Sequence, residues 1–101
     1  MSAMQPIDVP QRHGTVVVPG SPGLSRRVAA AVVRMAERFK SDILLNAGSL
    51  HIDAKSTLMA LMLLHALKGQ MVELTARGRD SRSAIRHLSA LFHQKEELWK
   101  R

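Results

Sequence analysis

The spacing of apolar residues along this chain changes several times, from strand-like to helical and back. Segments rich in proline or glycine lie between several of these stretches. Residues 15–18 (TVVV) form a β-branched run that is typical of a strand. The next segment, residues 19–23 (PGSPG), is rich enough in proline and glycine to predict a loop. Over residues 25–40 apolar side chains recur at helical spacing, with charged residues on the other side. A chain that alternates in this way must combine strands and helices around one core.

The same alternation continues through the rest of the chain. Alternating apolar residues predict a hairpin over residues 43–52, with its turn at Ala47-Gly48. We expect a second helix over residues 56–67, a strand over 72–76 and a last helix from about residue 80. The element order is β-α-β-β-α-β-α. It favours an α+β fold, an open-faced β-sandwich in which three helices cover one face of a four-stranded antiparallel sheet.

The size and composition of the chain limit its organisation. A chain of 101 residues is long enough for one domain. Because 46% of the residues are hydrophobic and only 3% are aromatic, the core must be built mainly from aliphatic side chains. Residues 1–13 show no periodicity and predict a flexible tail before a domain that spans residues 14–101. Cysteine is absent, which excludes disulfides, thiol nucleophiles and cysteine-ligated metals.

Charge and hydropathy indicate which partners this chain can have. The longest unbroken apolar run, residues 58–64, is too short for a membrane span, and residues 1–13 lack the apolar stretch of a secretory signal. We therefore expect a cytoplasmic protein with no membrane partner. The net charge of +7 is compatible with an anionic partner or with a solvated basic surface. Nucleic-acid binding is the weakest hypothesis, because three aromatic residues are too few for a base-stacking surface.

Two short motifs lie at the starts of the first and second predicted helices. Residues 23–29 (GLSRRVA) resemble the Gly-Leu-His-x-Arg-Pro-Ala active loop of the HPr family of the bacterial sugar phosphotransferase system. Lys55-Ser56 resembles the regulatory serine motif of that family, and Lys68-Gly69 follows the second helix as it does there. The resemblance extends over about residues 14–95, and it implies the same open-faced sandwich.

The resemblance also implies a site at the start of the first helix. In the family a histidine there accepts a phosphoryl group from Enzyme I and passes it to sugar-specific transport subunits. Ser25 matches that histidine, and Arg27 matches the arginine that stabilises the phosphate. Imidazole is nucleophilic near neutral pH and forms a transferable phosphoramidate, whereas a serine needs a base and forms a stable ester. Since no base is adjacent in sequence, ordinary phosphocarrier activity is not expected, and we expect a protein that is not an enzyme. No cofactor or metal is expected either. A helix N-cap is the favoured role for Ser25.

Ser56 is the candidate regulatory residue. In Gram-positive relatives the matching serine is phosphorylated by an ATP-dependent HPr kinase, and the product helps a transcription regulator to repress catabolic genes. A phosphate with a charge of about −2 is tolerated at a helix N-terminus and changes the surface beside it. A helix N-cap is the alternative role for Ser56, and Thr57 competes with it because the second helix is one residue longer than the family's.

The family's docking face combines the start of the first helix with the second helix. This implies that partners are contacted by Leu24, Arg26, Arg27, Met59 and Met62. Methionine suits such a face because its flexible side chain adapts to several partners. The alternative to a docking role for Arg26 and Arg27 is that both are ordinary surface charges. Inward packing is expected for Leu61 and Leu64.

The function that follows is regulatory docking within carbon catabolite control. The expected partners are phosphotransferase-system proteins, or HPr kinase and a transcription regulator. For the oligomeric state, a monomer and a strand-exchanged dimer are the two alternatives. The alternative function is a phosphocarrier with a non-standard acceptor, although the five histidines are expected to have packing or solvent-facing roles instead.

Overall fold

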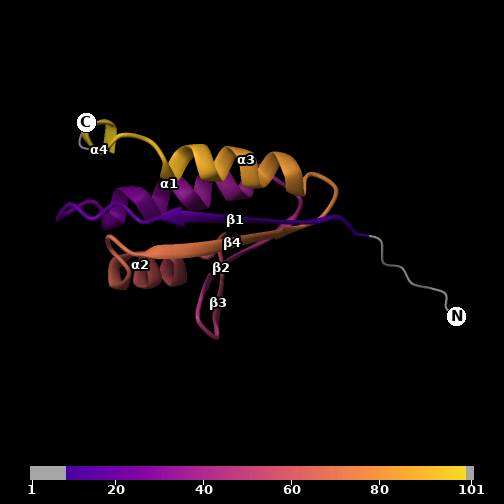
Figure 1. The fold of residues 1–101 in the computed structure, drawn as a ribbon, viewed down its shortest axis with the longest axis horizontal. Helices are drawn as coiled ribbons and strands as arrows, with labels where there is room; N and C mark the ends of the chain where they lie inside the picture. The colour runs from indigo at the N-terminus through magenta and orange to yellow at the C-terminus, as the bar shows by residue number, and fades with distance from the viewer. Residues whose placement is uncertain (1–8, 100–101) are drawn as a thin grey trace, which may run out of the picture.

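In the computed structural model, which describes residues 9–99, the strands bury alternate side chains and so give the sheet one covered face. Its elements are β1 (Gln11–Val17), α1 (Ser25–Glu37), β2 (Asp42–Ala47), β3 (Leu50–Asp53), α2 (Thr57–Ala66), β4 (Met71–Arg77), α3 (Ser81–Phe92) and α4 (Glu96–Trp99) (Figure 1). The strand order is β1-β4-β2-β3, and every neighbouring pair is antiparallel. The predicted four-stranded open-faced sandwich is confirmed.

The core lies between the covered face of the sheet and the three main helices. In β4, for example, Val72, Leu74 and Ala76 are buried while Met71 and Glu73 are exposed. Aliphatic residues of the helices close the core from the other side: Val28, Val32 and Ala36 of α1, Ala60, Leu63 and Leu64 of α2, and Ala84 and Leu88 of α3. Within residues 9–99 no helix has the length and apolarity that a bilayer span requires.

Several boundaries differ from the sequence-based expectations. β1 begins at Gln11, so residues 11–13, expected in the tail, pair with Arg77, Ala76 and Thr75 of β4. Residues 1–8 of the expected tail and residues 100–101 of the expected domain lie outside the described residues. The chain after α3 forms a further short helix, α4, that the periodicity did not predict. The earlier start of β1 is explained by backbone hydrogen bonding to β4. Such pairing on an edge strand does not require apolar side chains.

A contact between the turn before β2 and the turn before α3 holds α3 against the sheet. The Asp80 carboxylate accepts hydrogen bonds from the backbone N–H groups of Lys40 (2.8 Å) and Ser41 (3.0 Å) and from the Ser41 hydroxyl (2.5 Å). These hydrogen bonds, that of the Ser41 hydroxyl first, hold the pKa of Asp80 below its ordinary value. The start of β2 and the start of α3 are therefore joined through one ionised side chain.

We predict that Gly78→Ala destabilises the fold by on the order of 3 kcal/mol. Gly78 has φ +153°, and a Cβ there would lie 2.7 Å from Ser41 Cα, so the two turns would have to separate. Gly48→Ala is the control, because φ is +60° and nothing lies within 4 Å of its Cβ. Urea unfolding followed by circular dichroism measures both variants, and equal losses would contradict the steric explanation.

We predict that Asp80→Asn lowers the free energy of unfolding by about 1–3 kcal/mol at pH 7. Because the pKa of Asp80 is lower in the folded state, its ionised form stabilises the fold above the ordinary pKa of 3.8, and this stabilisation is lost as the pH falls through the folded-state value. The difference between variant and wild type should therefore shrink in unfolding experiments at the lowest accessible pH. Asp42→Asn, which changes an exposed carboxylate, is the charge-matched control. A difference independent of pH would refute the role of the Asp80 charge.

Candidate functional site

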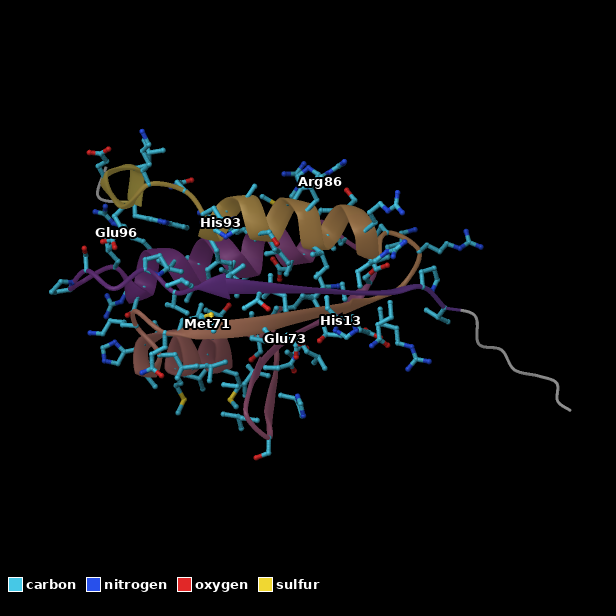
Figure 2. All side chains as sticks on the ribbon, in the orientation of Figure 1. His13, Met71, Glu73, Arg86, His93 and Glu96 are labelled. Atoms are coloured by element: carbon cyan, nitrogen blue, oxygen red, sulfur yellow. The ribbon has the colours of Figure 1, made fainter. Side chains whose placement is uncertain are left out.

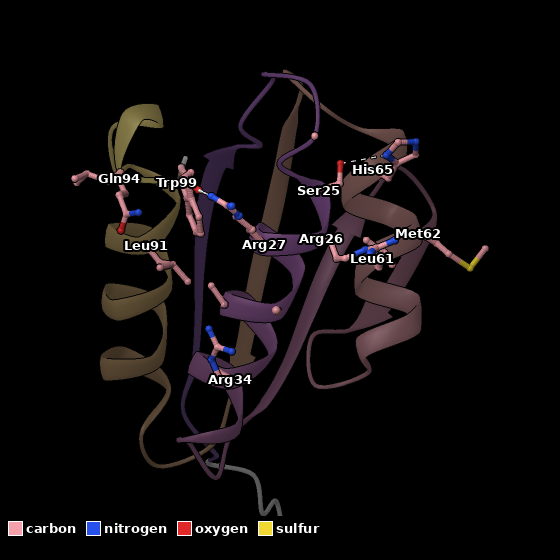
Figure 3. A pocket seen from close by; sticks show the side chains of 14 residues that line it. Ser25, Arg26, Arg27, Arg34, Leu61, Met62, His65, Leu91, Gln94 and Trp99 are labelled. Carbon is pink, nitrogen blue, oxygen red and sulfur yellow. Dashed lines mark hydrogen bonds between the residues drawn. The ribbon is translucent and has the colours of Figure 1, made fainter. Parts of the chain in front are cut away.

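An open groove of about 1030 Å³ lies over α1 from Ser25 to Arg34. We call it the α1 groove; α2 borders it on one side, and α3 and α4 border it on the other (Figure 3). Arg26, Arg27, Arg34 and His65 line it, and none of the described lining residues is acidic. The α1 groove is thus a basic surface that favours anionic groups on a partner.

The loop before α1 sets the direction of the motif residues. Gly23 adopts φ +83°, which lets the loop turn into the helix, and Leu24 then enters the core with 4% of its surface exposed. With Leu24 anchored, Ser25, Arg26 and Arg27 line the α1 groove. The burial of Leu24 removes it from the predicted docking residues, because its side chain cannot reach a partner.

Ser25 is not the N-cap that the sequence suggested. Leu24 holds that position, since its carbonyl accepts the first helical hydrogen bond from Val28 N at 2.9 Å. The Ser25 hydroxyl lies instead 3.1 Å from Nδ1 of His65 on α2 (Figure 3). Packing of α1 against α2 therefore supplies the neighbouring base that is missing along the sequence. No local pattern indicates this pair, because its two residues are 40 positions apart.

The two arginines of the motif face different neighbours. Arg26 extends towards Leu61 and Met62 on the α2 side of the α1 groove (Figure 3). Arg27 Nη1 donates a hydrogen bond to the backbone carbonyl of Trp99 at 2.8 Å. The Ser21 hydroxyl donates to the Glu96 carboxylate, so α4 contacts both the loop and the start of α1. Trp99 was not among the predicted site residues.

The predicted regulatory serine lies at the other end of α2. Ser56 is the N-cap residue, and its carbonyl accepts a hydrogen bond from Ala60 N at 2.9 Å. Its side chain makes no capping hydrogen bond within the described chain, and it is half-buried, while Thr57 is exposed. His65 lies nine positions after Ser56, which corresponds to about 14 Å along the helix. The two ends of α2 thus carry two separate candidate sites.

Apolar side chains on α2 are exposed between these two ends. Leu58, Met59 and Met62 are 65%, 41% and 59% exposed, which fits the predicted docking face. Met62 also lines the α1 groove. Leu64 is buried as expected, whereas Leu61 is only partly buried and lines the groove as well.

The other histidines lie away from the α1 groove. His13 is on β1, where its Nδ1 is 3.8 Å from a Glu73 carboxylate oxygen on the open face of the sheet (Figure 2). His51 Nδ1 lies 2.6 Å from Asn46 Oδ1. His93 follows α3 and is exposed. Of the described histidines, only His65 lines the groove.

Known proteins resemble this chain over most of its length. Residues 13–94 match the family described as the phosphotransferase-system HPr component phosphorylation site. The phosphocarrier protein HPr of Buchnera aphidicola is 35% identical over 74 residues, which are 73% of this chain and 86% of that protein. The HPr-like protein Crh of Bacillus subtilis is 39% identical over 72 residues, which are 71% of this chain and 84% of that protein.

Solved structures agree with these relationships. HPr-C-His from Thermoanaerobacter tengcongensis superposes with a TM-score of 0.72 at 32% identity, over 81% of this chain and 91% of that one. A crystal structure of Bacillus subtilis Crh, a dimer with a swapped domain, superposes with a TM-score of 0.60 at 26% identity, over 91% of this chain and 94% of that one. By sequence and by fold, this chain belongs to the HPr family of the phosphotransferase system.

Proposed function

We propose that this protein is a regulatory docking protein of the phosphotransferase system rather than a phosphate relay. The proposal is carried by Ser25, the first residue of α1, which stands in place of the histidine if GLSRRVA is matched to the family motif that it resembles. A serine phosphate is a stable ester, so a group placed on Ser25 would not pass readily to a sugar transporter subunit. The relative named HPr-like protein Crh supports a role distinct from that of HPr itself.

The docking surface in this proposal combines the α1 groove with the exposed face of α2. Arg26 supplies positive charge, and Met59 and Met62 supply adaptable apolar contacts. A partner with carboxylates beside apolar residues matches this chemistry. The proposed partners are phosphotransferase-system proteins, or HPr kinase and a transcription regulator, in the cytoplasm.

Phosphorylation of Ser56 is the proposed control of this surface. The backbone before α2 is ordered, because Lys55 N donates to Asp53 Oδ1 at 2.9 Å and Lys55 Nζ donates to the Phe39 carbonyl at 2.8 Å. A phosphate on Ser56 would meet the N-terminal N–H groups of α2, which favour an anion. It would also place negative charge beside the exposed Leu58 and Met59, and so change which partners can dock there.

The oligomeric state stays a prediction with two alternatives. β1 is an edge strand that pairs only with β4, so it could pair with β4 of a second copy. The swapped dimer of Crh supports a strand-exchanged form, and a monomer is the other alternative.

We predict that HPr kinase with ATP adds one phosphate to the wild-type chain and none to Ser56→Ala. Intact-mass spectrometry followed by peptide mapping measures the modification. Thr57→Ala is the matched control, since it removes the neighbouring exposed hydroxyl, and it should be phosphorylated like the wild type. Loss of the phosphate in Thr57→Ala alone would move the site to Thr57, and an unmodified wild-type chain would remove the switch from the proposal.

The Ser25–His65 contact favours a second candidate function, a phosphocarrier with His65 as its acceptor. When Nδ1 of His65 accepts the hydrogen bond from the Ser25 hydroxyl, that nitrogen carries a lone pair beside the start of α1. Once the Ser25 hydroxyl turns away and frees this lone pair, the nitrogen could attack the phosphorus of a phosphohistidine on Enzyme I. The new N–P bond would form as the donor's N–P bond breaks, with no net proton transfer.

Radiolabelled phosphoenolpyruvate with Enzyme I distinguishes the two functions. If the protein is regulatory, we expect no acid-labile label on the wild-type chain. Acid-labile label that disappears in His65→Ala and persists in His93→Ala, an exposed histidine outside the groove, would overturn the regulatory proposal. Tandem mass spectrometry under neutral conditions would then locate the phosphate.

A further inference from the structure

The last helix of the described chain lies against the loop that precedes the first helix. Ser21 and Glu96 are 75 positions apart in sequence, and Arg27 and Trp99 are 72 positions apart, yet both pairs are hydrogen-bonded. We infer that residues 95–99, which we call the α4 strap, act as an intramolecular ligand on one side of the α1 groove and engage the guanidinium of Arg27, although the Arg27 side chain stays exposed. A partner that uses Arg27 would then have to displace the strap. This inference rests on the proposed docking function of the groove.

The α4 strap lies outside the part of the chain that matches the family. The family match ends at residue 94, one residue before the strap begins. The strap's contacts nevertheless fall on the family-like motif, because Arg27 belongs to GLSRRVA and Ser21 to the loop before it. The strap is therefore an addition that acts on the matched region.

Burial of one side chain attaches the strap. Trp99 is 5% exposed and joins the hydrophobic core cluster, whereas Leu98 beside it is 44% exposed. Lys95, Glu96 and Glu97 are exposed as well. The indole is the largest apolar group that a side chain can bury, so it supplies most of the attachment.

Other features keep this attachment weak enough to be reversible. Nε1 of Trp99 is buried and has no hydrogen-bond partner within the described chain, which offsets part of the gain from burying the ring. The helix itself has four residues, too few to be stable without its contacts. The Ser21–Glu96 hydrogen bond involves exposed groups and adds only a modest attachment, but because the whole attachment is marginal its loss is enough to shift the balance towards release.

The strap forms part of one side of the α1 groove and leaves the other side open. On the α4 side, Arg27 donates to the Trp99 carbonyl, and Leu91, Gln94 and Leu98 contribute to the lining. On the α2 side, Ser25, Arg26, Met62 and His65 remain accessible. A segment that replaces the strap must reproduce its chemistry, so the displacing partner presents an aromatic residue close to a carboxylate.

Tryptophan fluorescence tests whether the strap is attached in solution. Trp99 is the sole tryptophan and the chain has no tyrosine, so the emission comes from the strap alone. We expect a blue-shifted emission that acrylamide quenches poorly in the wild type, and a red shift with stronger quenching in Ser21→Ala and Glu96→Ala. Glu97→Ala removes the same charge from an exposed neighbour and should behave like the wild type. Wild-type quenching as strong as that of free tryptophan amide would overturn the inference.

Arginine modification tests the engagement of Arg27. Both arginines are exposed, but only Arg27 donates to the strap, so phenylglyoxal should modify Arg26 faster than Arg27 in the wild-type chain, as followed by tandem mass spectrometry of the peptide that contains both. In Ser21→Ala and Glu96→Ala the rate for Arg27 should rise towards that for Arg26, with unchanged circular dichroism. Equal rates in the wild type would refute the engagement of Arg27 by the strap. Neither measurement needs a partner or a kinase, so failure of the strap and failure of the proposed function are separate results.

Discussion

The packing of α1 between α2 and α3 is the constraint on which the rest of this structure depends. Val28, Val32 and Ala36 are buried along one side of α1, and Leu24 is buried just before it begins. This anchoring leaves the first turn of α1 at the surface. Because α2 and the end of α3 flank that turn, three parts of the chain meet at residues 25–27. A different rotation of α1 would separate Ser25 from His65 and Arg27 from Trp99.

Periodicity predicted the architecture well because burial on one face is a local property of each element. The alternation of Val72, Leu74 and Ala76 and the helical spacing of Val28, Val32 and Ala36 both match the buried residues of the structure. The strand over residues 11–13 was missed because its polar side chains carry no such signal; its backbone pairs with β4 all the same. Backbone pairing on an edge strand cannot be read from hydropathy.

The candidate site was only partly predictable for a related reason. The motif GLSRRVA indicated the start of α1, and that segment does line the groove. Which residues meet it depends on contacts between helices distant in sequence, such as that of Ser25 with His65. Trp99, an isolated aromatic residue in a charged segment, was the one available sign that α4 packs against the domain. Leu24 could not be recognised as buried, because a single apolar residue before a helix has no periodicity.

The contacts at residues 25–27 bear on the chemistry that this region can perform. A phosphate-binding site needs donors that are available to the phosphate. Here the Ser25 hydroxyl is hydrogen-bonded to His65, and Arg27 donates to the Trp99 carbonyl, so the chain engages both groups itself. A phosphoryl group arriving at Ser25 would compete with these internal contacts, whereas a protein partner on the α2 side would meet the exposed Arg26 and Met62 without breaking either. These internal contacts are the reason that we propose docking at this groove rather than phosphate transfer through Ser25, with transfer through His65 as the alternative.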